Sequence, residues 1–558
     1  MKHSLRLTAL LLLCAVLFSA CTIDVSSLIP QTETEAPPVS TIPPTTEFPL
    51  AVISPAQPNQ TFGVGYTPGN IIDPFKTTSD INVQVGYLLY DRLFSIAPDG
   101  TIIPGICQSI STTDNVHYEL KLLPGLTFHN GSSLTVRDVA YSFHRAMSSP
   151  IYSIQLAPVD SVTSDNSAGV LNITLTAPIA SLSALLDFPI VSADTGASYA
   201  YDDYALLGSG RYYNDTEIME ETEYTFLQYN ADWYGYGGQR PALARIDLFT
   251  VTDKGDLLRR YFNSDIDILS LSSSENDPIA LHGEAEKREI TGSNLFFLGF
   301  NTRFQAFSYA SGRLGIAGLI DSSALCEASS LSGMIPVKYP VRAENRVASY
   351  LERGEASPEE APNPYSYLRN AGFSDSSTRI RYAGAEYTLK LLTCSDSNMM
   401  VTVANEVGKI LEKASFQVEI TSLPFAEYIQ ALYYGNFSLY IGMTQPAENY
   451  DYTYLIQNAD LFSSLYSSVT GKDVVPYGAG VSEEVDQALK ALRQLDNTDP
   501  LYFLDLSDAL IKLFDTYMPF VPLCFDKDTV YLRGSFVSNV SVTSHDIYYN
   551  IDSWAQPQ

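Results

Sequence analysis

The sequence predicts an α/β protein with two lobes, and three observations support this expectation. The chain has 558 residues, which is more than one hydrophobic core usually serves. Residues 118–122 alternate between apolar and polar side chains, as in a half-buried strand, and an amphipathic helix is predicted to begin at Val136. From Thr388 the pattern becomes β-α-β-α-β with short connections, which is typical of parallel strands.

The segment 118–145 holds the most informative local pattern. Pro124-Gly125 and Asn130-Gly131 predict turns after the strand. Thr135 is the predicted N-cap of the helix, because Asp138 follows at capping-box spacing and favours the positive end of a helix. The segment therefore predicts strand, turn and helix, a combination found in many α/β proteins.

The first twenty residues predict an export signal. Lys2 and Arg6 give a positive start, and the apolar stretch 7–17 is too short for a comfortable membrane span. Small residues then precede Cys21, an ending that resembles a bacterial lipobox. Residues 1–20 are therefore predicted to be a lipoprotein signal peptide, and lipidated Cys21 to anchor an extracytoplasmic protein to the cell membrane. A plain secretory signal with an incidental cysteine is the alternative.

A tether is predicted over residues 21–60. Proline, threonine, serine and glutamine dominate this stretch, and no apolar periodicity is present. Such a composition favours an extended chain without a packed core. The folded body is expected to begin at Thr61.

The charge balance excludes some partners. The formal net charge is −30 at pH 7, so nucleic acid and anionic lipid surfaces are unsuitable partners for the folded body. The charge fits either solubility at a cell surface or a preference for cationic ligands, and the sequence leaves both open.

Four cysteines remain after Cys14 and Cys21: Cys107, Cys326, Cys394 and Cys524. They show no CxxC or metal-type spacing, and four cysteines allow three disulfide pairings. The sequence does not choose among these pairings, and burial as free thiols is an equal alternative.

Motifs for catalysis or metal binding are absent from the sequence. The six histidines show no HExxH or other metal spacing, and no G-x-S-x-G elbow is present. We therefore predict that the protein is not an enzyme and uses no metal and no cofactor. A secreted hydrolase is the alternative from another class.

The region after residue 342 divides into two parts. Residues 343–381 are polar and rich in Ala, Ser, Glu and Pro, which predicts a surface insertion. Strands are then expected at 389–394, 416–423 and 437–441, with helices at 399–414 and 425–434 between them. Because ligands bind beyond the carboxyl ends of parallel strands, the loop 442–451 is expected to face a cleft.

A family resemblance rests on residues 128–143. The letters FHNG at 128–131, LT at 134–135, RDV at 137–139 and SF at 142–143 resemble the signature F-x-(D/N)-G-x-x-(L/F)-T-A-x-D-V-x-x-S. This is the signature of the family 5 extracellular solute-binding proteins, which are receptors of ABC importers for peptides, nickel and related solutes. Val136 departs from the pattern, since the family usually has Ala there. Further stretches that resemble the family follow in its order, at 62–66, 103–107, 207–212, 229–235 and 295–301.

The resemblance implies a type II periplasmic-binding-protein fold, with two lobes, an extra subdomain and a hinge between the lobes. The corresponding boundaries are 61–93, 205–275 and 523–558 for lobe I, 94–204 for the accessory subdomain, and 276–522 for lobe II. It also implies a monomer that captures a small solute, most often an oligopeptide, in an interlobe cleft and delivers it to the permease subunits of an ABC importer. A nickel complex, a glycan or an opine as ligand, and a sensor role on the same fold, are the alternatives.

The candidate ligand-binding residues lie in the stretches that would face this cleft. They are Tyr66, Gly208, Ser209, Gly210, Asn301, Met443, Thr444, Gln445, Glu448 and Asp451. Peptide-binding relatives often have an acidic residue, in an A-D-Y-like motif, that meets the α-amino group of the peptide. An ungapped match puts Ala447 at that position, so the role is expected for Glu448 or Asp451 instead. The alternative is that both carboxylates are solvated loop residues.

Overall fold

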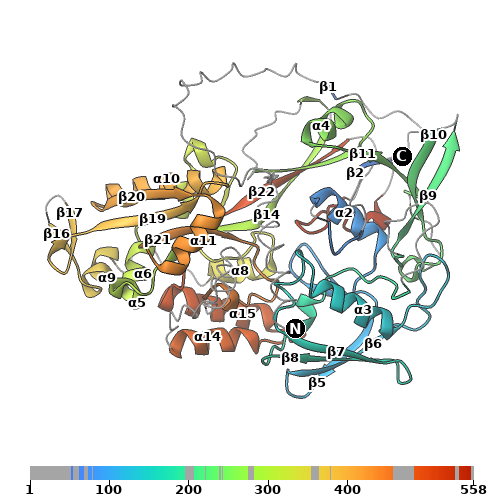
Figure 1. The fold of residues 1–558 in the computed structure, drawn as a ribbon, viewed down its shortest axis with the longest axis horizontal. Helices are drawn as coiled ribbons and strands as arrows, with labels where there is room; N and C mark the ends of the chain where they lie inside the picture. Colours follow the sequence, from blue (N-terminus) through green and yellow to red (C-terminus); the bar gives the residue numbers. More distant parts are fainter. Residues whose placement is uncertain are drawn as a thin grey trace, which may run out of the picture.

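The computed structural model of the chain has two α/β lobes that lie side by side and are joined by two long strands (Figure 1). This confirms the predicted α/β class. The predicted signal peptide, Cys21 and most of the predicted tether lie outside the residues that the structure describes. Those residues are 52–53, 62–67, 73–77, 79–194, 207–219, 222–237, 241, 243–273, 282–283, 285–353, 363–376, 379–456, 483–533 and 540–554.

Lobe I is built on a four-stranded sheet with the order β2-β11-β10-β9. β2 (Phe62–Tyr66) lies parallel to β11 (Arg245–Thr250), whereas β10 (Thr222–Tyr229) lies antiparallel to both β11 and β9 (Tyr212–Met219). α2 (Asp80–Leu89) contacts β2 and β9. The first four residues of β2 are buried, and a run of small and apolar side chains suits such a buried strand.

The accessory subdomain adds an antiparallel sheet with the order β5-β6-β8-β7 beneath lobe I (Figure 1). The predicted strand is β6 (His117–Leu122), and the predicted helix is α3 (Val136–Ala146). The capping box is confirmed, since the backbone N–H of Thr135 donates to the Asp138 carboxylate at 2.9 Å. The other strands are β3 (Phe94–Ile96), β4 (Ile102–Pro104), β5 (Cys107–Thr112), β7 (Val159–Asp165) and β8 (Val170–Leu175).

Lobe II contains the predicted β-α-β-α-β unit. β19 (Thr388–Cys394) pairs in parallel with both β20 (Gln417–Leu423) and β21 (Leu439–Thr444). The connecting helices are α10 (Asn398–Lys413) and α11 (Phe425–Tyr434). Ser397 is the N-cap of α10, since its hydroxyl accepts the backbone N–H of Met400 at 3.2 Å.

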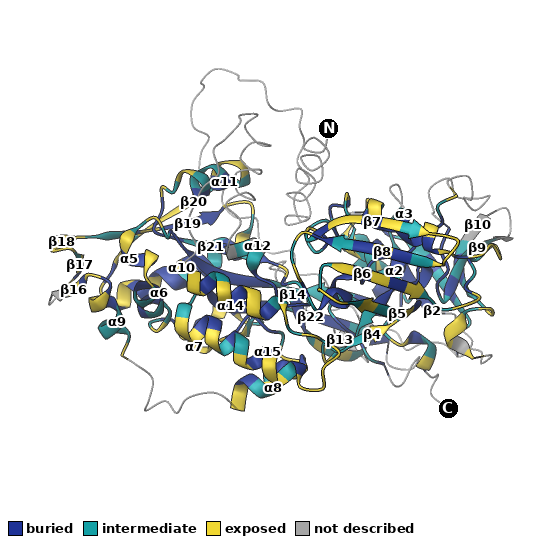
Figure 2. Ribbon diagram, turned by 90° about the horizontal axis from the view of Figure 1, so that it is seen from below, coloured by how far each residue is buried: buried dark blue, intermediate teal, exposed yellow. Residues whose placement is uncertain are grey.

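The surface insertion predicted at 343–381 is wrong in part. α8 (Arg346–Arg353) packs against α15 (Tyr502–Ile511), and its Val347 and Leu351 are buried. One apolar face is enough for a short helix to pack, and the polar composition of the whole segment does not reveal such a face. Figure 2 shows the same division on α14 (Glu483–Arg493) and α15, with exposed outer faces and buried inner faces.

Two described strands connect the lobes, β14 (Ala285–Phe300) and β22 (Val521–Arg533). On β22, Leu523 belongs to the hydrophobic core of lobe II, whereas Val530 and Leu532 belong to the core shared by lobe I and the accessory subdomain. On β14, Ile290 packs against that shared core and Phe296 lies in lobe II. The core therefore changes later along both strands than the boundaries predicted at 275/276 and 522/523.

The antiparallel pairing of β14 and β22 shifts register between Thr291 and Leu295, where the core changes. The Asp526 carboxylate stabilises this bulge by accepting the backbone N–H of Asn294 at 2.9 Å and its side-chain amide at 2.7 Å. Gly292 is required beside it, since a Cβ there would lie 2.1 Å from Asp526 Oδ1. A bulge at this position marks the hinge between the lobes.

The remaining described elements lie around these sheets. β1 (Val52–Ile53), inside the predicted tether, pairs in parallel with β13 (His282–Gly283). The others are α4 (Lys254–Phe262), β12 (Ile268–Ser272), α5 (Gln305–Ser308), α6 (Ala310–Ala317), α7 (Ser322–Cys326), β15 (Ile335–Pro336), α9 (Pro364–Asn370), β16 (Phe373–Ser376), β17 (Arg379–Tyr382), β18 (Ala385–Glu386), α12 (Thr453–Ile456) and the π-helix η6 (Lys512–Tyr517), with short 3-10 turns at 182–185, 234–236, 329–331 and 551–553.

Candidate functional site

A small polar cavity lies at the hinge, where both lobes and the accessory subdomain meet. Its walls come from the turn between β3 and β4, from Ile290 and Thr291 of β14, from the segment around Arg342, from Glu448 and from residues 542–545. Its volume is about 30 Å³. That volume holds water molecules but not a peptide, because ligand pockets usually have about 300–1,000 Å³.

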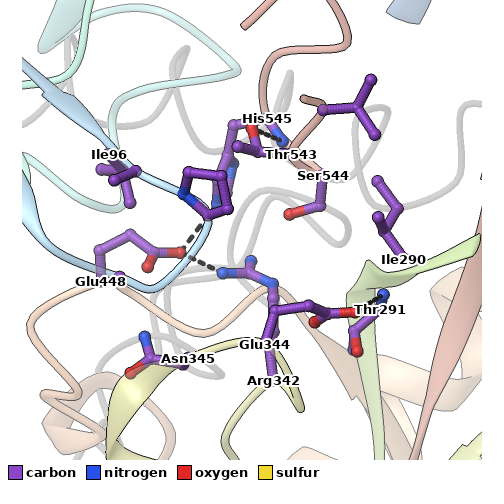
Figure 3. Close-up of a pocket in the computed structure, with 14 residues that line it drawn as sticks. Ile96, Ile290, Thr291, Arg342, Glu344, Asn345, Glu448, Thr543, Ser544 and His545 are labelled. Carbon is purple, nitrogen blue, oxygen red and sulfur yellow. Dashed lines mark hydrogen bonds and ion pairs between the residues drawn. The ribbon is translucent and has the colours of Figure 1, made fainter. Parts of the chain in front are cut away.

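Glu448 forms the charged centre of this cavity (Figure 3). Its carboxylate accepts from Arg342 Nη1 at 2.5 Å, within lobe II, and lies 2.9 Å from His545 Nε2 of the carboxyl-terminal segment. The Glu448 and Arg342 side chains are only 10% and 14% exposed, so water screens their charges weakly. Glu448 therefore joins the two lobes through its side chain.

The pKa of Glu448 is shifted by opposing effects. Burial alone would raise the pKa of this carboxyl, but the positive charge of Arg342 and the contact with His545 outweigh burial and hold the pKa well below its usual range. Glu448 is therefore ionised at neutral pH. A buried anion at an interlobe cavity is a suitable partner for a cationic group.

Local backbone structure positions Glu448. A turn closes when the backbone N–H of Tyr450 donates to the Ala447 carbonyl at 2.9 Å, and Tyr450 has a left-handed φ of 56°. This turn follows the carboxyl end of β21, as the strand pattern predicted. Ala447, the position that matches the acidic residue of peptide-binding relatives, packs against the core shared by lobe I and the accessory subdomain.

His545 is positioned by a hydroxyl-centred turn. Thr543 Oγ1 accepts the backbone N–H of His545 at 3.2 Å and that of Asp546 at 2.8 Å. The adjacent backbone N–H of Ile547 donates to the Gln84 side chain of α2 at 2.9 Å. His545 is thereby fixed to lobe I while its ring reaches Glu448.

Arg342 connects this charged centre to the hinge. Its Nε lies 3.4 Å from the carbonyl oxygen of Gly292 in the bulge. The neighbouring Glu344 carboxylate accepts the backbone N–H of Thr291 at 2.8 Å. The segment around Arg342 therefore contacts both the hinge and Glu448.

The accessory subdomain also touches lobe II away from the cavity. The backbone N–H of Ala180 donates to the Arg493 carbonyl at 2.7 Å, and the Asn497 amide donates to the Ser183 hydroxyl at 2.8 Å. These contacts and the Glu448–His545 contact close the space between the lobes. Entry of a peptide-sized ligand therefore requires the lobes to separate.

The structure places the other predicted acidic residue outside the cavity walls. Asp451 Oδ1 accepts the backbone N–H of Thr453 at 2.9 Å and also the hydroxyl of Thr453. Its other oxygen lies 4.0 Å from Arg493 Nε. Asp451 thus holds the local backbone at the start of α12.

The predicted glycine-rich loop packs on lobe I. A Cβ at Gly208 would lie 2.2 Å from the Leu89 carbonyl oxygen, and one at Gly210 would lie 2.5 Å from the Leu89 carbonyl carbon. Ser209 is buried beside Asp91, and burial raises the pKa of Asp91 to about 6 although Trp233 and Ser209 oppose the shift. Close packing against the end of α2 explains the small residues here.

The remaining predicted residues lie on three elements. Tyr66 ends β2, with its hydroxyl 3.3 Å from Thr250 Oγ1. The Asn301 amide follows β14 and donates to the Gly435 and Phe437 carbonyls at 3.0 and 2.7 Å. Met443 and Thr444 end β21, and Gln445 follows them at the surface. Of the ten predicted ligand-binding residues, the structure brings Glu448 alone to the cavity wall.

Sequence reasoning missed the two partners of Glu448. Arg342 is 106 residues away and His545 is 97 residues away, and no motif marks either one. Within the described part of the chain, no group of three or more His, Cys, Asp or Glu side chains is arranged to hold a metal ion. Among the same described residues, no helix is long and apolar enough to cross a membrane.

Two lobes, a two-stranded crossing with a bulge, and a polar cavity between the lobes define a two-lobed binding protein of the α/β class. The family model of bacterial extracellular solute-binding proteins, family 5 middle, matches residues 101–461. The chain therefore belongs to the family 5 extracellular solute-binding proteins, and the predicted family and type II fold are confirmed. A comparison with curated proteins found no match.

Solved structures show the same fold at low sequence identity. HbpA2 from Haemophilus parasuis has a TM-score of 0.66 at 15% identity, with 89% of this chain and 100% of that chain covered. A nickel ABC transporter protein from Bacillus halodurans has a TM-score of 0.65 at 16% identity, with 87% and 98% covered. The oligopeptide-binding protein AppA from Bacillus subtilis, solved with a nonapeptide, has a TM-score of 0.55 at 16% identity, with 89% and 99% covered.

Proposed function

We propose that this solute-binding protein is the extracytoplasmic receptor of an ABC importer, and that it captures an oligopeptide between its lobes and delivers it to the permease. Family 5 membership supports a receptor rather than an enzyme. A lipid on Cys21 and the stretch 21–60 would hold the monomeric body near the membrane.

The observation that carries the ligand class is the buried, ionised carboxylate of Glu448 on the interlobe cavity. A peptide has a free ammonium group, and burying that charge in a closed cleft is costly unless an anion meets it. Glu448 contacts one cationic partner in its own lobe and one histidine in the other. When the lobes separate, the His545 contact is lost, and a ligand ammonium group can take its place without leaving the carboxylate unpaired.

Calorimetry with a mixed peptide library and its amino-acetylated counterpart tests this assignment. We expect the free library to bind and the acetylated library to bind weakly or not at all. Glu448→Gln should weaken binding of the free library by roughly thirtyfold or more, since removing one partner of a buried charge pair costs about 2–5 kcal/mol. Asp451→Asn is the matched control, because this carboxylate of the same loop is bonded to Thr453 instead.

The outcomes separate the two parts of the proposal. Equal binding of both libraries would refute the role of Glu448 and leave peptide binding in place. Binding of neither library would refute the peptide class, and the same titration with nickel complexes would then test the second candidate, which the likeness to the nickel ABC transporter protein supports.

Ligand-driven closure gives a separate expectation. The free protein in solution should have a larger radius of gyration than the ligand-bound protein, because a ligand that binds both lobes draws them together. Binding to the closed form should also add about 2.7 kcal/mol of stability at a ligand concentration a hundredfold above Kd. Small-angle scattering and thermal melting measure both effects, and an unchanged radius under saturating ligand would reject closure.

A further inference from the structure

Two of the four cysteines lie next to each other at the edge of the lobe II core. Cys326 ends α7 and is half-buried, whereas Cys524 lies on β22 and is fully buried. Cys524 is a member of the lobe II hydrophobic cluster, and Cys326 packs against that cluster. On β22, Cys524 stands opposite Phe296 of β14 and Pro336 of β15, so the strand is fixed on both sides.

The geometry of α7 over β22 explains why these two thiols meet. The Ser322 hydroxyl, at the start of α7, lies 3.4 Å from the Pro522 carbonyl oxygen of β22. Four residues along a helix advance the chain by about 6 Å. Two residues along a strand advance it by about 6.6 Å and return to the same face. α7 contacts both β22 and β15, and β15 pairs with β22 at Phe525 and Cys524, so α7 lies over this part of β22 and brings Cys326 to Cys524.

We propose that Cys326 and Cys524 form a redox-active dithiol that closes to a disulfide and fastens α7 to the interlobe strand β22. Disulfides require Cα atoms about 4.4–6.8 Å apart, and α7 contacts β22 directly. Extracytoplasmic compartments also supply oxidants that thiols of the cytosol do not meet.

The two thiols have distinct roles in the exchange. The Cys524 thiol donates a hydrogen bond to the Cys326 sulfur, which lowers the pKa of Cys326 against the opposing effect of burial. The same bond and burial raise the pKa of Cys524 well above its usual value. The more exposed Cys326 is therefore the attacking thiolate, and buried Cys524 is the resolving thiol.

The reaction balances with a low-molecular-weight disulfide as the oxidant. The Cys326 thiolate attacks one sulfur of that disulfide, the sulfur–sulfur bond breaks, and the first small thiolate leaves. Cys524 then gives its proton to solvent and attacks Cys326 Sγ, which expels the second small thiol. The two cysteines are oxidised together by two electrons, and the small disulfide is reduced to two thiols.

Peptide mapping of the full chain tests the proposal, with oxidised glutathione as the probe. The reduced protein is equilibrated with oxidised glutathione, alkylated in denaturant and digested without reductant. We expect a peptide linked through Cys326 and Cys524, which disappears in Cys326→Ser and persists in Cys107→Ser, a buried thiol of the accessory subdomain. Alkylation of both cysteines, a glutathione that stays on Cys326, or a link between other cysteines would overturn the proposal.

Melting of the same wild-type samples tests the fastening role. The link closes a long loop of the chain, so the oxidised wild-type protein should melt at a higher temperature than the reduced protein. This difference should vanish in Cys326→Ser. A linked protein that melts with the reduced one would overturn the fastening role.

Discussion

Replacing Asp267 with alanine should lower the free energy of unfolding of lobe I by about 3–5 kcal/mol, the cost of leaving a buried charge without its partner. Asp267 Oδ1 lies 3.1 Å from Arg533 Nε, and both side chains are fully buried. Asp267 Oδ2 also accepts the backbone N–H of Gly63 at 2.7 Å. The pair therefore fixes the end of β22 to the first strand of lobe I.

Tryptophan fluorescence in a urea titration measures this effect. The sequence has two tryptophans, Trp233 and Trp554, and both lie in lobe I, where Trp554 packs edge-on against Phe62 with ring centroids 6.1 Å apart. Asp265→Ala is the control, because that carboxylate is 36% exposed and lies 3.4 Å from Arg260. Such a pair contributes about 1 kcal/mol or less. Equal losses in both variants would show that the buried pair is not the anchor.

Asp528→Asn should stabilise the protein at pH 8 and have little effect at pH 4. Burial raises the pKa of Asp528 to about 7, and the carboxylates of Asp526 and Asp80 add to the shift, whereas Ser272 and Arg342 oppose it. Between roughly pH 4 and pH 7, the folded protein holds a proton that the unfolded chain has released. The wild-type free energy of unfolding therefore falls as the pH rises through this window, by up to about 4 kcal/mol.

Urea unfolding followed by circular dichroism from pH 4 to pH 8, at constant ionic strength, measures this dependence. The asparagine has no proton to lose, so the curves of wild type and Asp528→Asn should diverge as the pH rises. Asp505→Asn on the exposed face of α15 makes the same change in net charge and should follow the wild type. Parallel curves for wild type and Asp528→Asn would contradict the Asp528 carboxylate as the source.

The sequence determined the α/β class, the capping box at Thr135 and the β-α-β-α-β unit of lobe II, because each rests on local periodicity. The stretch 295–301, which resembles the family, covers only the end of β14, since residues 285–290 lie half-exposed in lobe I and are mostly polar. The helix α8 was missed for the same reason. Both elements depend on contacts with distant parts of the chain, which a local pattern does not encode.

The candidate site could likewise be predicted only in part, because local patterns do not show contacts between distant segments. Glu448 could be expected at a cleft because its loop follows a strand that is parallel to its neighbour. Its partners Arg342 and His545 come from distant segments, and only the folded hinge brings them together. The glycines at 208 and 210 were predicted from the family resemblance, but packing against Leu89 explains their size, and contact with a ligand remains a prediction.

The Asp526 carboxylate at the bulge limits how the lobes can move. It binds Asn294 on β14 and the Ser272 hydroxyl of β12 at 3.0 Å, so one side chain ties three neighbouring strands together at the crossing. Hydrogen-bonded strands tied in this way resist sliding past one another in the plane of the sheet, but they still bend out of that plane. We therefore expect separation of the lobes to bend the crossing strands rather than to slide them past one another, and to break the contact between Glu448 and His545.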